Sequence, residues 1–577
     1  MREITTKTNE RLEKFKELYT AALIQAEGNR ERLCRHMNQY LGSDEIDGSS
    51  ERASVVRNIT YEIIESQIDA DIPPVKVDTS CYSTKRDRNA RAVERLCSAL
   101  RSRLPFAELN DRDERYTYIY GGSVFYVEWD STPSDNAGEG GVKVHLLSPL
   151  DFIPQPNVSA VEDMEYCFLH FTTTRGELMS RYGADERELA LADCEYAIAE
   201  GDGLGDTVAL IIAFYKDEDG RCGRFVFSGD LALEDIPDYY SRKSRICHNC
   251  NKPTDLCQCE KPDHTLTNIE GETVTNEMGE SVYIPYYVPK DFPIIIRKNT
   301  ISDMTLLGGS DCERIRSQQQ AVNKIESRIL QKLLRSGVTP IMPEGTAITL
   351  SNAVFGQIIK TRPGESPTSY GTIDTTPDIS QDIKASDRLY DHAKRVLGIS
   401  DALQGLDNTK SESGYARELK IARSASRLET KKRMKQLAYC RLYELIFKHY
   451  LAFADKPRRF AFRDTLGRID FSEFNRYDFI EEGDGGYYYD DSYLFTVDER
   501  ASQSYQSEEL WQTNLVNLEK GTLGDRESPE TLLRYWQLQD KAHFPNAREN
   551  VEYFQDIINR KKQETNTITE SEIQINE

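Results

Sequence analysis

Four closely spaced cysteines in a polar stretch of the sequence are the residues with the clearest potential for chemistry. They form the pattern Cys247-x2-Cys250-x6-Cys257-x-Cys259. Two cysteine pairs at this spacing can bring four thiolates together on two tight turns, and four thiolates at about 2.3 Å form a tetrahedral ligand set for structural Zn²⁺. The spacing therefore predicts one zinc ion held by these four residues.

Other interpretations of the cysteines are disulfides or an iron–sulfur cluster. His248 could replace one thiolate, although we expect it to point outward. Because four thiolates fill the coordination sphere, no position is left for a catalytic water, and the predicted site is structural. The surrounding insert, 241–288, has few apolar residues. A small unit without its own hydrophobic core needs a structural metal ion to stabilise its fold.

The sequence shows no catalytic constellation. It contains no Gly-x4-Gly-Lys-Ser/Thr loop, no Gly-x-Ser-x-Gly and no His-Glu-x-x-His. The histidines are dispersed along the chain: His36, His145, His170, His248, His264, His392, His449 and His543. We therefore predict that the protein is not an enzyme.

Composition indicates a folded chain with a large polar surface. The 577 residues carry a formal net charge of −23, and 38% of them are hydrophobic. This acidic balance argues against a dedicated nucleic-acid binder held by phosphate contacts. It does not exclude a protein past which DNA slides, since a negatively charged surface repels phosphates. No apolar stretch of about 18 residues occurs, so we expect no transmembrane helix.

One long predicted helix, from about Ser413 to Phe453, organises the chain. At ~1.5 Å per residue it would extend about 60 Å, which is typical of an elongated or multi-subunit body. Its middle carries a cationic belt: Arg423, Arg427, Lys431, Lys432, Arg433 and Lys435. We interpret the belt either as a solvated face or as a contact with an acidic neighbour or nucleic acid.

The first 300 residues predict an α+β domain with its helices first. Helical patterns over 10–40, 52–70 and 85–102 precede β-branched and aromatic stretches, including 123–130 and 142–147, that indicate strands. The third helix has a strongly basic outer face: Arg86, Arg88, Arg91, Arg95 and Arg101. This face predicts a solvated surface or, alternatively, a contact with nucleic acid or an acidic neighbour.

A helical hairpin is predicted before the long helix. Its two helices, 310–337 and 376–398, enclose a small β-rich unit at 338–375. Each helix combines an apolar stripe with a polar face, so one side can pack against protein while the other faces water. The following stretch, 399–412, is rich in Gly, Asn and Ser and predicts a flexible loop.

Several short motifs occur in a fixed order along the chain. They are Gly-Gly-Ser-Val-Phe-Tyr-Val-Glu-Trp-Asp at 121–130, Leu-Ser-Pro-Leu-Asp-Phe-Ile-Pro at 147–154, Gly-Gly-Ser-Asp at 308–311, Gln-Ala-Val-Asn-Lys-Ile-Glu-Ser at 320–327, and Leu-Gly-Ile-Ser-Asp-Ala-Leu-Gln-Gly at 397–405 running into Ser-Glu-Ser-Gly-Tyr-Ala at 411–416. These motifs, together with the order of predicted helices and strands over 10–560, make the sequence resemble the portal proteins of tailed bacteriophages and prophages. The cysteine insert is not a general feature of that family.

The resemblance implies a ring, usually of twelve copies, at one capsid vertex. Double-stranded DNA would pass through its channel during packaging and ejection without sequence readout. The implied partners are the terminase motor, a head–tail adaptor, and the major capsid and scaffolding proteins. The implied location is the virion, after assembly in the host cytoplasm, with no membrane contact.

The resemblance also assigns parts of the chain. The assignments are 1–309 and 413–500 as wing (with the insert at 241–288), 310–337 and 376–398 as stem helices, 338–375 as clip, 399–412 as tunnel loop, and 501–577 as helical crown and polar tail. Lys384, Lys394 and Lys410 are candidate channel-facing cations under this resemblance, and each could equally be an ordinary surface residue.

Two other classes of function compete with a DNA conduit. A zinc-containing nucleic-acid-processing enzyme, or its accessory subunit, would explain the cysteines, but the missing catalytic motifs and the acidic balance count against it. A scaffold built on long helices would explain 413–453, but the strand-rich first half counts against a pure coiled coil.

The cysteine pattern gives the first testable prediction. Metal analysis of the purified protein should find about one zinc ion per chain, because all four thiolates of one site bind one ion. A zinc-free preparation after careful anaerobic purification would contradict the prediction.

Overall fold

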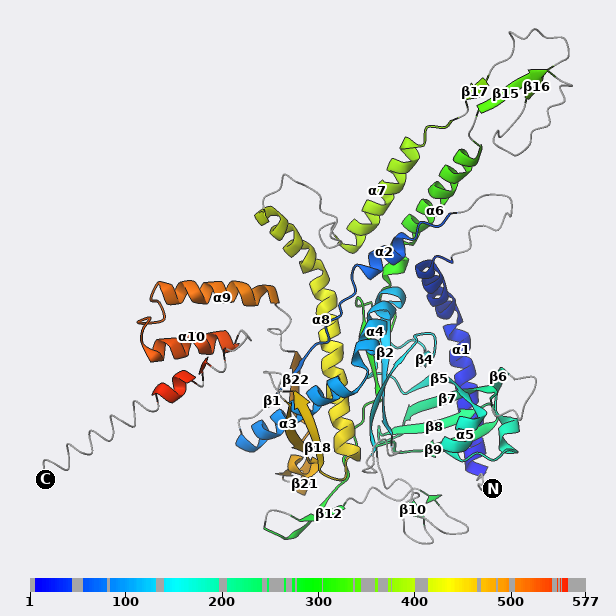
Figure 1. Ribbon diagram of the computed structural model, residues 1–577. Helices are drawn as coiled ribbons and strands as arrows, with labels where there is room; N and C mark the ends of the chain where they lie inside the picture. Colours follow the sequence, from blue (N-terminus) through cyan, green and yellow to red (C-terminus); the bar gives the residue numbers. More distant parts are fainter. Residues whose placement is uncertain are drawn as a thin grey trace. The chain divides into compact units, whose positions relative to one another are not determined.

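The computed structural model describes most of the chain. The described residues are 6–43, 55–79, 83–130, 140–196, 205–240, 246–247, 264–265, 272–275, 278–302, 305–335, 338–343, 359–361, 372–374, 376–399, 414–463, 469–483, 486–497, 504–541, 547, 550–551 and 553–558. The chain divides into two compact units: unit 1 is Met1–Ala70 with Asp78–Leu494, and unit 2 is Asp71–Val77 with Phe495–Glu577. Helices and strands are mixed, in agreement with the predicted α+β class (Figure 1).

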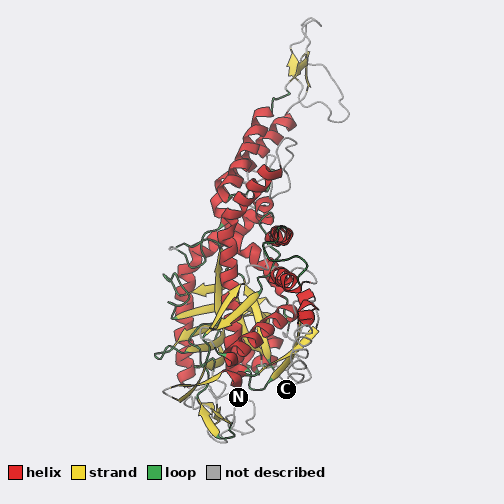
Figure 2. Ribbon diagram, turned by 90° about the vertical axis from the view of Figure 1, so that its left-hand side faces the viewer, coloured by secondary structure: helices red, strands yellow, loops and turns green. Residues whose placement is uncertain are grey.

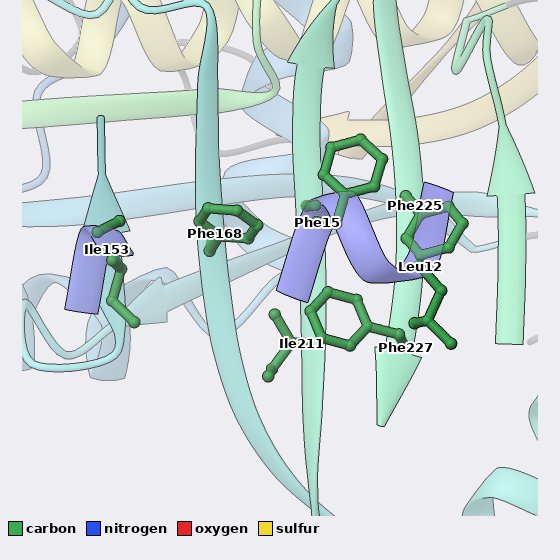
Figure 3. Close-up of a cluster of buried hydrophobic side chains, with 9 residues drawn as sticks. Leu12, Phe15, Ile153, Phe168, Ile211, Phe225 and Phe227 are labelled. Atoms are coloured by element: carbon green, nitrogen blue, oxygen red, sulfur yellow. The ribbon is translucent and has the colours of Figure 1, made fainter. Parts of the chain in front are cut away.

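A six-stranded antiparallel sheet forms one core of unit 1. Its order is β4-β5-β7-β8-β9, with β6 paired to β7. The strands are β4 (Phe152–Pro154), β5 (Tyr166–Thr174), β6 (Cys194–Tyr196), β7 (Thr207–Lys216), β8 (Cys222–Ser228) and β9 (Leu231–Ile236), with α5 (Arg175–Tyr182) and the 3-10 helix Glu188–Leu191 between them. Helix α1 (Thr6–Leu41) covers the sheet, where its Leu12 and Phe15 pack against Phe168, Phe225 and Phe227 (Figure 3). The helix predicted over 10–40 is confirmed.

A second, three-stranded sheet has the order β14-β2-β3. Its strands are β2 (Gly122–Asp130), β3 (Gly141–Leu147) and β14 (Ile294–Lys298), all antiparallel. The two strands predicted at 123–130 and 142–147 are confirmed as a hairpin. Aromatic side chains join this sheet to the long helix, with ring centroids 5.8 Å apart for Phe125 and Tyr439 and 5.5 Å apart for Trp129 and Tyr450.

Three helices precede the three-stranded sheet: α2 (Ile59–Glu65), α3 (Thr84–Arg103) and α4 (Phe106–Tyr120). The prediction of a helix over 52–70 was wrong in length, because α2 is the only helical part of the described residues 55–70. Backbone groups of Val55 and Arg57 instead hydrogen-bond side chains of a later helix, and the Asn58 side chain caps α2. Helix α4 was not predicted.

The predicted hairpin and long helix are present. The elements are α6 (Asp311–Arg335), β15 (Val338–Pro343), β16 (Ile359–Thr361), β17 (Thr372–Asp374), α7 (Ser380–Leu397) and α8 (Gly414–Phe453). Strand β15 pairs in parallel with β16 and antiparallel with β17. Gly398 ends α7 in the left-handed conformation that favours glycine, with φ of +79°.

The remaining elements are short strands, a 3-10 helix and two helices. In unit 1 these are β10 (Ile246–Cys247), β11 (His264–Thr265), β12 (Glu272–Thr275), β13 (Ser281–Ile284), β18 (Arg458–Arg463), β19 (Ile469–Phe474), the 3-10 helix Arg476–Phe479, β20 (Ile480–Gly483) and β21 (Gly486–Tyr489). Strand β1 (Val75–Thr79) pairs with β22 (Tyr493–Val497), and unit 2 also contains α9 (Ser504–Glu519) and α10 (Pro529–Lys541).

Gly121 joins α4 to β2 at a crowded position. Its φ is +94°, and a Cβ atom there would lie 2.7 Å from the carbonyl oxygen of Gly308 in the loop before α6. Its own carbonyl oxygen accepts a hydrogen bond from the Asn299 amide at 2.9 Å. A side chain would therefore push the loop away from the sheet.

Replacing this glycine gives the second prediction. Gly121→Ala should lower the free energy of unfolding by about 2–4 kcal/mol, because left-handed backbone strain and overpacking add. Denaturant titration would measure the loss. Gly183→Ala is the matched control: Gly183 is also left-handed at φ +63°, but a Cβ there meets nothing within 4 Å, so it should cost only about 1 kcal/mol. Equal losses in both variants would contradict the prediction.

Candidate functional site at the base of the helical hairpin

Helices α6 and α7 form a hairpin that packs on α2 at one end. Figure 1 and Figure 2 both show the two helices side by side. The buried apolar residues between the three helices are Ile59 and Ile63 of α2, Ile315 and Val322 of α6, and Tyr390, Ala393 and Leu397 of α7. Apart from Tyr390, these residues belong to the predicted apolar stripes, which explains why one face of each helix is buried within a single chain.

Four large apolar residues of the hairpin are exposed. The exposed fractions are 46% for Leu333, 67% for Leu334, 43% for Ile383 and 42% for Val396. Their sequence spacing had placed them in the same stripes as the buried residues. The hairpin therefore has more apolar surface than one chain covers.

Ionic contacts connect α7 to α6 and to the segment before α2. Lys332 pairs with Asp382 across the hairpin. Arg57 lies 3.1 Å from the Asp387 carboxylate, and its guanidinium lies over the Tyr390 ring. The Lys332–Asp382 pair joins α6 to α7 near the end of the hairpin that carries β15, and Arg57 joins α7 to the segment before α2.

A buried amide network fixes the beginning of α6. Gln319 Oε1 accepts hydrogen bonds from the amide and the hydroxyl of Thr60, both at 2.9 Å, and its amide donates to the Arg57 carbonyl oxygen at 2.8 Å. Gln39 of α1 donates to Thr60 Oγ1 and to the Cys312 carbonyl oxygen, both at 3.0 Å. Because buried amides are costly unless bonded, this network specifies one position of α6 on α1 and α2.

The first residue of α6 forms an ion pair with the long helix. Asp311 is fully buried and lies 2.5 Å from Lys431 of α8. Asn299 donates a hydrogen bond to its other oxygen at 2.9 Å, and Lys431 also donates to Gln67 at 2.9 Å. A carboxylate at this end of α6 is further stabilised by the helix dipole.

A second group of buried charges lies one turn further along α8. Lys435 is 3.1 Å from Glu114 of α4 and donates to the Asp69 carbonyl oxygen at 2.9 Å. Arg297 of β14 lies 2.7 Å from Glu114 and 2.5 Å from Asp113. The long helix is thereby bound to α4, and α4 is bound to β14, through side chains that water does not reach.

The six charged residues form what we name the ionic cluster. Its members are the acids Asp113, Glu114 and Asp311 and the bases Arg297, Lys431 and Lys435. Their formal charges cancel. Burial raises the pKa of Asp113 against the opposing effect of Arg297. Burial also acts to raise the pKa of Glu114, but Arg297 and Lys435 outweigh it and the pKa is lowered.

The cluster corrects the interpretation of the cationic belt. Lys431 and Lys435 are buried, with 8% and 1% exposure, so they are neither solvated nor available to a partner. Lys432 is half-buried and Arg433 is exposed. The side chains of Arg423 and Arg427 lie outside the described residues. Sequence spacing could not separate these roles because the acids that pair with Lys431 and Lys435 are more than 100 residues away in the chain.

The candidate channel cations differ in their surroundings. Lys384 is exposed on α7. Lys394 is buried, with its ammonium 4.4 Å from the Tyr390 ring centroid and 3.2 Å from Asp391. Lys410 lies outside the described residues. The channel role of these lysines concerns an assembly and stays a prediction.

The predicted zinc ligands fall mostly outside the described residues. Cys250, Cys257 and Cys259 are not described, and Cys247 is described only as a backbone position in β10, where it pairs with His264 of β11. Among the described residues no group of three or more potential metal ligands occurs. The scattered cysteines that are described are free thiols: Cys34, Cys97, Cys167, Cys194, Cys222, Cys312 and Cys440.

Comparisons with known proteins give no assignment. None of the described helices is both long and apolar enough to cross a membrane. Neither a family model nor a characterised protein matches this sequence.

The ionic cluster gives the third prediction. Lys431→Met should lower the free energy of unfolding by about 3–5 kcal/mol, because it leaves the buried Asp311 carboxylate without its cation. Lys432→Met is the matched control, since Lys432 makes no ion pair with any described residue, and it should cost within about 0.5 kcal/mol. Denaturant titration would measure both changes.

A double variant tests whether the loss comes from the unpaired carboxylate. Asp311→Asn removes the charge but keeps an oxygen that can accept from Asn299. Lys431→Met with Asp311→Asn should therefore lose clearly less stability than the sum of the single changes. Additive losses would show that the two residues do not interact.

Proposed function

We propose that this protein is the subunit of a portal ring, a non-enzymatic conduit for double-stranded DNA at a capsid vertex. The observation that carries the proposal is the order of its described parts. An α+β body leads into the α6–α7 hairpin, the hairpin encloses the small sheet β15-β16-β17, and the long helix α8 follows. This is the order that the resemblance to phage portal proteins requires.

The exposed apolar side chains of the hairpin also support a ring. Leu333, Leu334, Ile383 and Val396 cost free energy in water, and burial against neighbouring copies would recover about 25 cal/mol for each Å² covered. A hairpin with one face packed on its own chain and another free for neighbours is suited to a ring of parallel stems.

The parts would then act as follows in such a ring. The body of unit 1 forms the wing, α6 and α7 form the stem, and β15-β16-β17 forms the clip that meets the terminase motor and later the head–tail adaptor. Residues 399–412 form the tunnel loop, and residues 501–577 form the crown and its polar tail. Major capsid and scaffolding proteins would surround the wing in the virion.

We further propose that the cysteine insert binds one structural zinc ion. The backbone pairing of Cys247 with His264 brings together the two ends of the segment that contains Cys250, Cys257 and Cys259. A four-thiolate site likewise requires the two cysteine pairs to lie close together. The four thiolates would bind the ion and fix the turns of the insert.

Imaging of the purified protein provides the fourth prediction. Negative-stain images or native mass measurement should give a closed ring near twelve copies with a central hole, because the exposed hairpin faces need neighbours. A compact monomer at every concentration would contradict the proposal.

Substitutions on the hairpin give the matched control. Leu334→Asp with Ile383→Asp should prevent or weaken the ring, since both charges would enter the contact between copies. Ile301→Asp changes an apolar residue outside the hairpin that is more exposed than either, with 73% exposure, and should leave the ring intact. Loss of the ring in the control alone would contradict the role of the hairpin.

A further inference from the structure

The outer face of α1 carries a row of glutamates. Glu10, Glu13 and Glu17 are exposed on the side of the helix opposite Leu12 and Phe15, which pack on the six-stranded sheet. None of the three glutamates makes an ion pair with a described residue. We name these residues the acidic stripe.

The neighbouring bases of α1 leave the acidic stripe with a net negative charge. Arg11 is paired with Asp235 at 2.9 Å, and Lys16 is paired with Asp230. Lys14 is exposed at the edge of the stripe. Three carboxylates therefore remain in water on the surface of α1.

Helix α3 carries the opposite charge in the same arrangement. Arg88, Arg91 and Arg95 are exposed and form no ion pair with a described carboxylate. Arg95 also lies over the Phe462 ring, 5.1 Å from its centroid. Arg86, by contrast, faces the chain itself and is 3.2 Å from Asp490. We name the three exposed arginines the basic stripe.

The two stripes match in spacing and lie apart in the molecule. Each has its charges at positions i, i+3 and i+7 of a helix, so each stripe is about 10 Å long and keeps to one side of its helix. Helix α1 packs on the six-stranded sheet, whereas α3 packs on β18 and β19. Figure 1 shows the two helices at opposite sides of unit 1, so the stripes cannot pair within one chain.

We propose that the acidic stripe of one copy docks on the basic stripe of the next copy. This inference rests on the proposed ring and names one of its contact surfaces. A contact between two different surfaces of identical subunits is heterologous, and such contacts close into a ring when the rotation between copies permits. With the two helices parallel, Glu10, Glu13 and Glu17 can each face one arginine.

Charge complementarity favours a second copy over nucleic acid as the occupant. The overall charge of −23 would repel a DNA duplex that approached the three arginines. A bound duplex would also leave the acidic stripe without a partner. A second copy satisfies both stripes at once. Ion pairs of this kind contribute mainly register and discrimination between partners, while apolar contacts such as those of the hairpin contribute most of the affinity.

Charge reversal on the full-length protein tests the inference, which is the fifth prediction. Arg88→Glu, Arg91→Glu and Arg95→Glu together place like charges opposite each other, so rings should be lost at about 0.1 M salt, where the screening length is about 10 Å. Glu10→Arg, Glu13→Arg and Glu17→Arg should have the same effect. Combining all six reversals should restore the rings, because it exchanges the two stripes and returns the net charge to −23.

A control separates local pairing from overall charge. Arg187→Glu, Lys456→Glu and Arg526→Glu change three exposed bases elsewhere and alter the net charge by the same amount as the reversal on α3. This control should keep its rings. The readout is the fraction of rings in native mass measurement and negative-stain images.

The possible outcomes distinguish this inference from the proposed function. Rings that persist in both triple reversals would overturn the docking of the stripes and leave the portal proposal standing. Absence of any association in the unaltered protein would overturn both. Unchanged rings together with weaker retention of duplex DNA in the α3 variant would assign the basic stripe to nucleic acid instead.

Discussion

The burial of six charges at one place is the constraint on which the structure of unit 1 depends. Taking charges out of water costs several kcal/mol for each ion unless partners lie close by in the correct geometry. The ionic cluster meets this requirement only when α4, β14, the start of α6 and the middle of α8 come together. Apolar packing alone would tolerate sliding between these elements. The cluster therefore fixes the register of the long helix on the body.

The same constraint determines where the hairpin begins. Asp311, the first residue of α6, is bound to Lys431, and Gln319, two turns later, is bound to the backbone of the segment before α2. The beginning of α6 is thus fixed at two levels, by charge and by amide hydrogen bonds. Further along, Leu333 and Leu334 are exposed. Contacts within one chain thus fix the base of the hairpin, while apolar side chains further along it stay exposed.

Sequence periodicity predicted the elements whose burial depends on one apolar stripe. Helices α1, α6, α7 and α8 begin and end close to their predicted residues. Helix α4 was missed because buried polar residues, Asn110, Asp113 and Glu114, occupy its inner face, and periodicity treats such residues as solvated. The burial of Lys431 could not be predicted for the same reason. The cysteine site stays a prediction, and it could be proposed from the sequence because its four candidate ligands lie close together there, whereas the ionic cluster joins residues from distant segments.

Net charge sets a further requirement on any assembly of this chain. Copies that each carry −23 repel one another, so stable contacts need either apolar surface or local opposite charges. The ionic cluster is formally neutral and buried, and it contributes little to that repulsion. The described surface of unit 1 offers exposed apolar residues on the hairpin, and it offers two stripes of opposite charge on α1 and α3. Apolar contacts alone would allow several relative orientations of two acidic subunits. In the proposed assembly, complementary stripes would favour the orientation that pairs them over orientations that bring acidic surface against acidic surface.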